Sequence, residues 1–282
     1  IRDTHKKTLI VFTAVAEGKG ATSYKLVAAA KKLDAVFFSK DILAVKFARH
    51  APGAEISFFA MGSNETDNLT NALKLIEAYK TRQHTHLYVF STKIESQLLL
   101  TAVDKGYIKV RRINEVQSLV NRMLYEQGQE LFRSAVQTAE GKQICAVVVG
   151  MGRHGTELVK ALSWYGQMDG YTLEIHAFDQ DPLAEDKFTA KAPELMSPAY
   201  NGTCVAGEAQ YKITIHSGVQ AGTNTFAQEI AKITNATYVI VALGSDDENI
   251  NTAVELRMYF ERMGIKPVIK TIVYNTSQAR AL

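Results

Sequence analysis

The chain is poor in cysteine, in proline and in net charge. Its 282 residues include two cysteines, five prolines and one tryptophan, and the formal net charge is +3. Cys145 lies in a segment that we expect to be a buried strand, which argues against a disulfide and favours a reducing, cytoplasmic environment. A net charge this small gives no support to nucleic-acid binding, which needs a clustered basic face.

Long apolar runs and targeting signals are also missing. No apolar run reaches the ~18 residues that a membrane helix needs, and no signal peptide is visible. The chain begins with Ile1 rather than Met, and its last residues, TSQARAL, have the composition of a helix start. We therefore expect this chain to be a piece of a longer protein.

What the sequence does have is a steady alternation of apolar, β-branched runs with amphipathic segments. Strands separated by single helices indicate right-handed crossovers and parallel sheets. The expected strands are 8–15, 35–39, 55–62, 86–91, 107–113, 144–150, 172–179, 212–218, 237–244 and 266–273. The expected helices are 23–33, 68–80, 93–105, one starting at Asn114, 155–165, 224–233 and 248–263.

The length suits two domains. Residues 134–143 are polar, small and non-periodic, so we place the boundary there and expect domains 1–137 and 138–282. Each is expected to be an α/β, Rossmann-like domain with a doubly wound parallel sheet. Residues 183–210 are expected to be an irregular insertion with a short helix around APELM.

The chain also repeats itself at domain length. FFAMGSNETDNLTNA in the first half matches VIVALGSDDENINTA in the second. Gly62 matches Gly244 at a spacing of 182 and Asn68 matches Asn249 at 181, which implies one inserted residue. Two copies of one fold are therefore expected.

The second copy opens on a glycine turn, VVVGMGRHGTE, in which Gly150, Gly152 and Gly155 follow a strand and precede a helix. This pattern permits a tight turn, close approach of a pyrophosphate and close helix–strand packing. Asp179 lies 24 residues past Gly155 at the end of the next strand, where it can accept hydrogen bonds from ribose hydroxyls. Asp179 would repel a 2′-phosphate, and Gln180 rather than Arg follows it, so NAD or another adenosine nucleotide without a 2′-phosphate is favoured over NADP.

In the first copy, Gly18 and Gly20 lie too far from the strand end to form such a turn. That copy is therefore expected to be degenerate.

Other candidates surround the turn. Arg153 is either a phosphate contact or a solvated side chain, and His154 is more readily explained as solvated. The segment after the fourth strand of the second copy should rim the same crevice. The candidate cofactor-binding residues are Gly150, Met151, Gly152, Arg153, His154, Gly155, Asp179, Gln180, Gly244, Ser245 and Asp246. No catalytic or metal-binding residue is assigned, since the seven histidines show no zinc spacing with cysteine.

VVVGMGRHGTELVKAL, FDQDP and ATYVIVALGSDDENINTAV together resemble the TrkA-N domain family, also called RCK, the regulator of potassium conductance. The resemblance covers residues 143–282 and is weaker in the first half. It implies NAD(H), ATP or ADP as a regulatory ligand, control of a potassium channel or other transporter in the same or another chain, and homo-oligomeric assembly. Two features depart from the family: HSGVQAG stands where a Gly-Asp pair is usual, and residues 183–210 are atypical.

Two other functions stay open. An NAD-dependent oxidoreductase of the short-chain type needs Tyr-x-x-x-Lys, and no tyrosine here has lysine four residues on. Nor does a separate substrate domain follow the dinucleotide half. The third interpretation is an interaction module with a vestigial site, in which the helix after Asn114 pairs the copies or the chains. We expect a regulatory ligand-binding protein rather than an enzyme.

Overall fold

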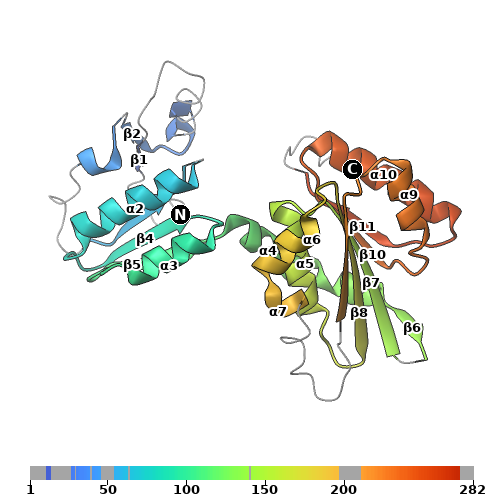
Figure 1. The fold of residues 1–282 in the computed structure, drawn as a ribbon. Coiled ribbons are helices and arrows are strands. Elements are labelled where there is room, and N and C mark those ends of the chain that lie inside the picture. Colours follow the sequence, from blue (N-terminus) through green and yellow to red (C-terminus); the bar gives the residue numbers. More distant parts are fainter. Residues whose placement is uncertain are drawn as a thin grey trace. The chain divides into compact units, whose positions relative to one another are not determined.

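The computed structural model describes residues 11–13, 27–28, 30–38, 40–45, 54–62, 64–139, 141–196 and 211–273. The chain divides into two units, Ile1–Asn114 and Glu115–Leu282. Each is an α/β unit built on parallel strands, as the sequence predicts (Figure 1).

The second unit contains a sheet of five parallel strands with a sixth, antiparallel one. Along the sheet the parallel strands run β11, β10, β7, β8, β9. Counted from β7, this is the order 3-2-1-4-5 of the Rossmann fold, whose ligands bind at the carboxyl ends of the strands. The strands are β6 (Val136–Thr138), β7 (Gly141–Val149), β8 (Tyr171–Asp179), β9 (Tyr211–Ser217), β10 (Tyr238–Val241) and β11 (Val268–Thr271).

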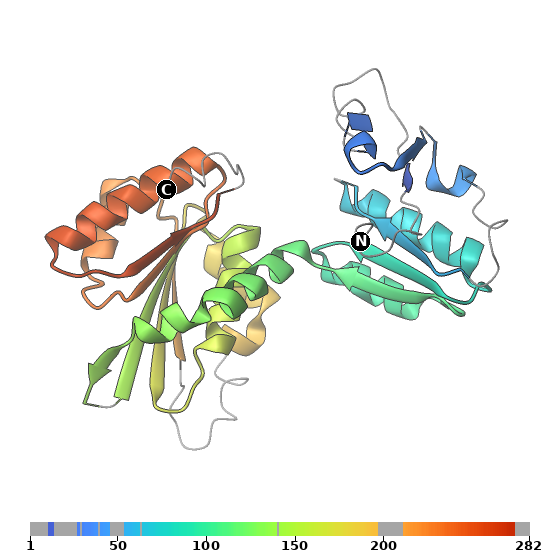
Figure 2. The same cartoon turned by 180° about the vertical axis from the view of Figure 1, so that it is seen from behind.

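Helices cover both faces of this sheet, which makes it doubly wound (Figures 1 and 2). Along β7, Ile144, Ala146 and Val148 face one layer, and the residues between them face the other. The first layer consists of α4 (Glu115–Arg133), α5 (Arg153–Tyr165), α6 (Ala184–Lys191) and α7 (Pro193–Met196). The second consists of α9 (Asn224–Ala231) and α10 (Asp246–Arg262).

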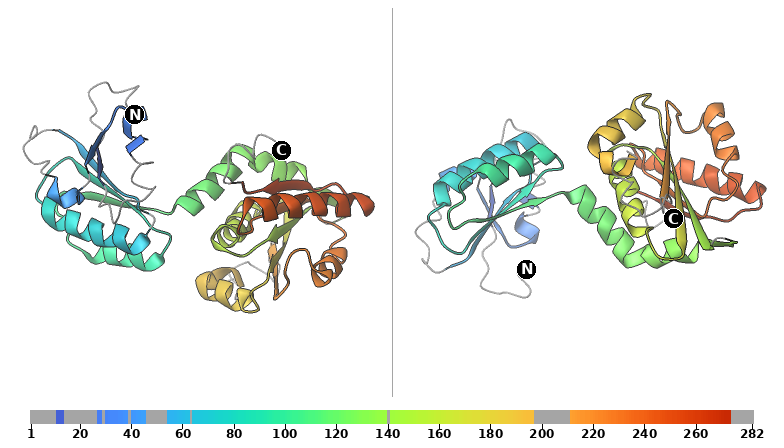
Figure 3. Two further views of the ribbon diagram at one scale, coloured as in Figure 1. Left: turned by 90° about the horizontal axis from the view of Figure 1, so that it is seen from above. Right: turned by 60° about the horizontal axis from the view of Figure 1, so that its bottom comes forward.

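The first unit has a smaller three-stranded parallel sheet in the order β3, β4, β5 (Figure 3). Its core is formed with α2, whose Ala72, Leu75 and Ile76 are buried against strand residues such as Leu87 and Val89. A separate parallel pair joins β1 and β2. The elements are β1 (Val11–Thr13), β2 (Val36–Phe38), η1 (Ile42–Ala44), β3 (Ile56–Ala60), α2 (Glu65–Tyr79), β4 (Thr85–Phe90), α3 (Ile94–Ala102) and β5 (Lys109–Ile113).

Two expectations about segments are corrected. Residues 134–143 are not a plain linker, because β6 forms there and pairs antiparallel with the start of β7. Helix α4 packs on α5 within the second unit, so the contacts divide the chain after Asn114 rather than after residue 137. The supposed insertion at 183–210 begins with α6 and α7, which belong to the crossover from β8 to β9. Its residues 197–210 lie outside the described part, as do Gly18 and Gly20. Of the helix expected at 23–33, residues 23–26 and 29 also lie outside it, and residues 27, 28 and 30–32 are helical.

The internal repeat is visible as the same hydrogen-bond clamp in both units. The buried Asn68 side chain accepts a hydrogen bond from the Gly62 amide at 2.6 Å and donates to the Gly62 and Phe90 carbonyls at 2.9 and 3.0 Å. The buried Asn249 does the same with Leu243 at 2.6 and 3.4 Å and with the Ile272 carbonyl at 3.0 Å.

This clamp corrects the alignment of the repeat. Gly62 is equivalent to Leu243, not to Gly244, so strand, turn and helix share a spacing of 181. Phe90 and Ile272 are 182 apart, which places the extra residue after the helix.

Candidate functional site

The turn after β7 requires glycine at its first and last positions. Gly150 has a φ of 96°, which disfavours other residues, and its amide donates to the Phe178 carbonyl at 2.8 Å. A Cβ on Gly150 would lie 2.6 Å from the Ala242 carbonyl oxygen, and one on Gly155 only 1.7 Å from the Gly150 carbonyl oxygen. Backbone therefore packs against backbone where α5 leaves the sheet.

Gly152 differs from both neighbours. Its φ of −62° suits any residue, and a Cβ there would meet nothing within 4 Å. It is the N-cap of α5, and no side chain caps this helix, whereas Thr223 caps α9 and Ser245 caps α10. Packing of the protein thus does not explain a glycine at position 152, and the space beside it is open.

Asp179 reaches the turn from the end of β8. One carboxylate oxygen accepts the Met151 amide at 2.6 Å, and the other accepts the Asp181 amide at 2.8 Å. A carboxylate can accept about four hydrogen bonds, so both oxygens retain acceptor capacity. Gln180 is exposed beside it.

Arg153 and His154 form the first turn of α5. Arg153 is exposed and His154 is half-buried. Burial, and then the neighbouring Arg153 charge, lower the pKa of His154 below its usual 6.5. His154 is therefore neutral at pH 7 and contributes no charge toward a phosphate.

The segment after β10 lies beside the turn, since the space around Gly150 is bounded by Ala242 and the Leu243 side chain. Gly244 is exposed and Asp246 is half-buried at the start of α10. The Ser245 hydroxyl accepts the Glu248 amide at 3.3 Å, which caps α10, and donates to the Glu248 carboxylate at 3.0 Å. The structure thus brings the turn, Asp179 and the 242–244 segment together, while the Ser245 hydroxyl is occupied by its cap.

The corresponding edge of the first unit is filled by its own side chains. The Glu65 carboxylate accepts from the Ser91 hydroxyl at 3.0 Å and from the Thr92 amide and hydroxyl at 3.0 and 2.7 Å. Arg112 donates to the Ser91 carbonyl at 3.0 Å. Burial alone would raise the pKa of Glu65, but these hydrogen bonds outweigh it and lower the pKa below 4.5. Glu65 is therefore ionised and held at the strand ends.

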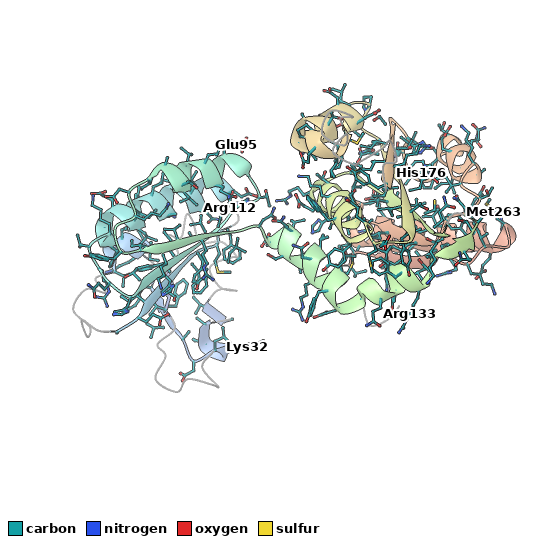
Figure 4. The ribbon with its side chains drawn as sticks, turned by 90° about the horizontal axis from the view of Figure 1, so that it is seen from below. Lys32, Glu95, Arg112, Arg133, His176 and Met263 are labelled. Atoms are coloured by element: carbon teal, nitrogen blue, oxygen red, sulfur yellow. The ribbon has the colours of Figure 1, made fainter. Side chains whose placement is uncertain are left out.

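Sequence reasoning missed a cluster of ionisable groups in the second unit. Cys145, Glu174 and His176 each offer a ligand atom, and these atoms lie within 4.8 Å of one another. Figure 4 labels His176 among the side chains of this unit. Burial and then the Glu174 charge raise the pKa of Cys145 to about 12, so its thiol is protonated at neutral pH. The only sequence signal was Glu174 and His176 at alternate positions of one strand, because Cys145 joins them through strand register.

A hollow of about 660 Å³ lies elsewhere in the second unit. Thr237 and Val268, at the amino ends of β10 and β11, line it together with Arg133 of α4. Ligands of open α/β sheets bind at the carboxyl ends. The hollow is therefore at the opposite edge from the glycine turn, and the chemistry of the turn defines the candidate site better than this volume does.

Comparisons with known proteins do not assign a family. No family model and no curated protein sequence matches the chain. Among solved structures, a dipicolinate synthase subunit from Bacillus halodurans is 13% identical with a TM-score of 0.29, over 94% of this chain and 89% of that one. A dipicolinate synthase from Bacillus subtilis is 10% identical with a TM-score of 0.29, over 94% and 88%. D-lactate dehydrogenase of Escherichia coli is 12% identical with a TM-score of 0.19, over 81% and 91%.

At these scores the structural similarity carries no information about function, and the fold is assigned from the strand order. No family model supports the TrkA-N resemblance, which rests on the sequence motifs alone. None of the helices in the described part of the chain has the length and apolar character that a bilayer crossing requires.

Proposed function

We propose that the second unit binds an adenine nucleotide, NAD(H) first and ATP or ADP as alternatives, as a regulatory ligand. The observation that carries the proposal is Gly152. Gly152 is the N-cap residue of α5, and no side chain accepts a hydrogen bond from the first amides of that helix. The space that a Cβ at this position would occupy is open. Amides at a helix N-terminus bind phosphate through hydrogen bonds and the helix dipole, and a glycine there lets the pyrophosphate approach the backbone.

The Asp179 carboxylate, at the end of β8, is suited to bind a ribose rather than a second phosphate. Both its oxygens already accept one amide, which fixes the carboxylate beside the turn. Two ribose hydroxyls can donate to the remaining acceptor positions, whereas a 2′-phosphate offers this carboxylate no hydrogen-bond donor in place of the 2′-hydroxyl. The proposed ligand is therefore unphosphorylated at the 2′ position.

We favour regulation over catalysis because the sequence lacks the proton-donating pair that a short-chain reductase uses beside the nicotinamide. The sequence contains no Tyr-x-x-x-Lys pair. Following the TrkA-N resemblance, we propose that nucleotide occupancy controls an ion channel or transporter, in the same or another chain, through homo-oligomeric assembly.

The test compares two glycine variants of the whole chain. Gly152→Val adds a side chain whose Cβ would meet nothing within 4 Å, so it should fold normally and bind nucleotide at least 30-fold more weakly. Binding is measured by calorimetry with NAD, NADH, NADP, ATP and ADP, and by thermal shift. Ligand at 100 times its dissociation constant adds about 2.7 kcal/mol, which raises the melting temperature by about 5 °C or more.

The second variant, Gly152→Ala, is the milder one. It adds a single methyl group to the same open space, so it should fold like the parent chain and weaken nucleotide binding less than valine does. A graded loss from glycine through alanine to valine is expected where a phosphate approaches the backbone at this position.

Three results would oppose the proposal. If none of the nucleotides binds, the interaction module with a vestigial site becomes the better interpretation. Unchanged binding in Gly152→Val would place the ligand elsewhere. Turnover of NADH with a panel of carbonyl substrates would favour the oxidoreductase.

A further inference from the structure

Four ionisable side chains form a line on the sheet face that α9 covers. Nε2 of His176 lies 3.3 Å from a carboxylate oxygen of Glu174, and Nδ1 of His176 lies 3.2 Å from Nε2 of His216. Nδ1 of His216 lies 3.7 Å from a carboxylate oxygen of Glu229 on α9. The order is therefore carboxylate, imidazole, imidazole, carboxylate. The three contacts join oxygen to nitrogen, nitrogen to nitrogen, and nitrogen to oxygen.

This line is one N–H short when both imidazoles are neutral. Each of the three contacts needs an N–H between its two atoms, and two neutral imidazoles supply one N–H each. When His216 donates to Glu229 and His176 donates to His216, Nε2 of His176 turns its lone pair toward the Glu174 carboxylate. A cation between these two atoms satisfies both.

A third ligand atom lies at the same place. Cys145 on β7 is directly opposite Glu174 on β8 in the sheet register. Its sulfur lies within 4.8 Å of the Glu174 and His176 ligand atoms. The thiol is a weak hydrogen-bond donor and supplies little to this position, but a thiolate is a strong ligand for borderline and soft metals.

We propose that Cys145, Glu174 and His176 bind one divalent transition-metal ion, with zinc as the best match. Sulfur, imidazole nitrogen and carboxylate oxygen are the three donor types that Zn²⁺ takes in proteins. Ligand atoms around a tetrahedral zinc lie about 3.3–3.7 Å apart, given bond lengths of about 2.0–2.3 Å. The Glu174–His176 contact already has this spacing, and the sulfur, which lies within 4.8 Å of both atoms, needs to move by no more than about 1.5 Å.

His216 and Glu229 act as positioning residues. Metal-bound histidines donate their other N–H to an acceptor that fixes the ring. With the metal on Nε2 of His176, its Nδ1–H can donate to Nε2 of His216 at 3.2 Å. His216 is itself stacked on Phe178, with ring centroids 4.2 Å apart and planes 7° from parallel. The ring that orients His176 is thus held by stacking and by Glu229.

The charges around the site permit an ion to enter. Cys145 is buried, but the Glu174 and His176 side chains are 23% and 15% exposed, so the approach is from their side. Lys212 lies 3.7 Å from Glu174 with a side chain 74% exposed, and it can turn into solvent when a cation arrives. Lys232 is paired with Glu229, away from the metal ligands.

The test uses the full chain without a histidine tag. Calorimetry with Zn²⁺ should give one ion per chain, with a dissociation constant below about 1 µM. Titration with Co²⁺ should give the ultraviolet charge-transfer band of a cobalt–thiolate bond. Cys145→Ala should abolish that band, and Cys204→Ala, which removes the other cysteine, should keep it.

Histidine variants separate ligation from positioning. His176→Gln should weaken Zn²⁺ binding at least 100-fold, and His216→Gln about 10- to 100-fold. His86→Gln is the matched control, because His86 faces Glu55 at 3.6 Å in the first unit but has no cysteine in its described surroundings. Circular dichroism of each metal-free variant checks folding, and His176→Gln tests the site if Cys145→Ala unfolds.

Less than one Zn²⁺ per chain, a cobalt–thiolate band that depends on Cys204, or unchanged affinity in a folded His176→Gln would each overturn the proposal. None of these readouts depends on nucleotide binding.

Discussion

At the residue scale, Gly155 shows how backbone packing can dictate a side chain. The Gly150 carbonyl oxygen would lie 1.7 Å from a Cβ at position 155. We expect Gly155→Ala to lower the free energy of unfolding of the second unit by about 3 kcal/mol, since α5 must shift from the sheet. Urea denaturation measures this, with Gly152→Ala as control, which should change stability by under about 1 kcal/mol. Equal losses of stability in Gly155→Ala and Gly152→Ala would contradict the conclusion that backbone packing requires glycine at position 155 but not at position 152.

The glycine turn was readable because its constraints are local. The spacing of Gly150, Gly152 and Gly155 follows from one strand, one turn and one helix. The Cys145–Glu174–His176 cluster was not readable, because it depends on which residues β7 and β8 place opposite each other. A shift of one residue in that register would move one partner to the other face of the sheet.

The asparagine clamps are a second case at this scale. We expect Asn249→Ala to destabilise the second unit by about 2 kcal/mol, because it removes the side-chain partner of the half-buried Leu243 amide and Ile272 carbonyl. Asn68→Ala should do the same in the first unit. The exposed Asn251 on the same helix provides the control, Asn251→Ala, with a change under about 0.5 kcal/mol. Chemical denaturation followed by circular dichroism is the measurement, and a loss under about 0.5 kcal/mol in Asn249→Ala would show that water replaces the clamp.

At the element scale, alternation and periodicity predicted most strands and helices, but not the connections. Helix α6 was missed because its sequence, AEDKFTAK, buries only Ala184 and Phe188 and so has little apolar periodicity. The short β6 was missed because it exposes most of its side chains and exists through its pairing with β7. Both elements depend on tertiary contacts that a single sequence does not show.

The contact between α2 and the end of β4 should make the first unit sensitive to acid. The pKa of Glu65 lies below its ordinary 4.5 because hydrogen bonds from Thr92 and Ser91 outweigh burial. A lowered pKa in the folded state contributes stability that is complete above pH 4.5 and is lost as the pH falls through the folded value. The stability of the first unit can be followed by hydrogen exchange of peptides from β4 at increasing urea. The measurement is made at about pH 6 and again below pH 4.5, and the difference gives the stability lost on acidification.

The matched variant is Glu65→Gln, which keeps the shape and one carbonyl acceptor but does not titrate. It should be less stable than the parent chain at about pH 6 and should lose less stability on acidification. A parallel loss in both chains would mean that another group dominates the acid response.

At the scale of the whole molecule, length and the repeat predicted two α/β units, but α4 was assigned to the wrong side of the boundary we drew from composition. The apolar face of α4 is visible in the sequence, but an apolar face alone does not indicate which sheet the helix packs against. In the structure Val120, Leu124 and Leu131 are buried in the core that α5 and β7 share. The polar segment that follows α4 is then a hairpin inside the second unit, not a linker.

Two fragments test this assignment. We expect residues 115–282 to unfold cooperatively and residues 138–282 to be less stable by roughly 5 kcal/mol or more, because the shorter fragment exposes the surface that Val120, Leu124 and Leu131 cover, at about 1.5–3 kcal/mol for each buried side chain. A loss of that size is comparable with the whole stability of a typical domain, about 5–15 kcal/mol. The shorter fragment should therefore aggregate or show no cooperative transition in urea. Equal stability of the two fragments would mean that α4 adds no net stability to the second unit, and would return the boundary to residues 137 and 138.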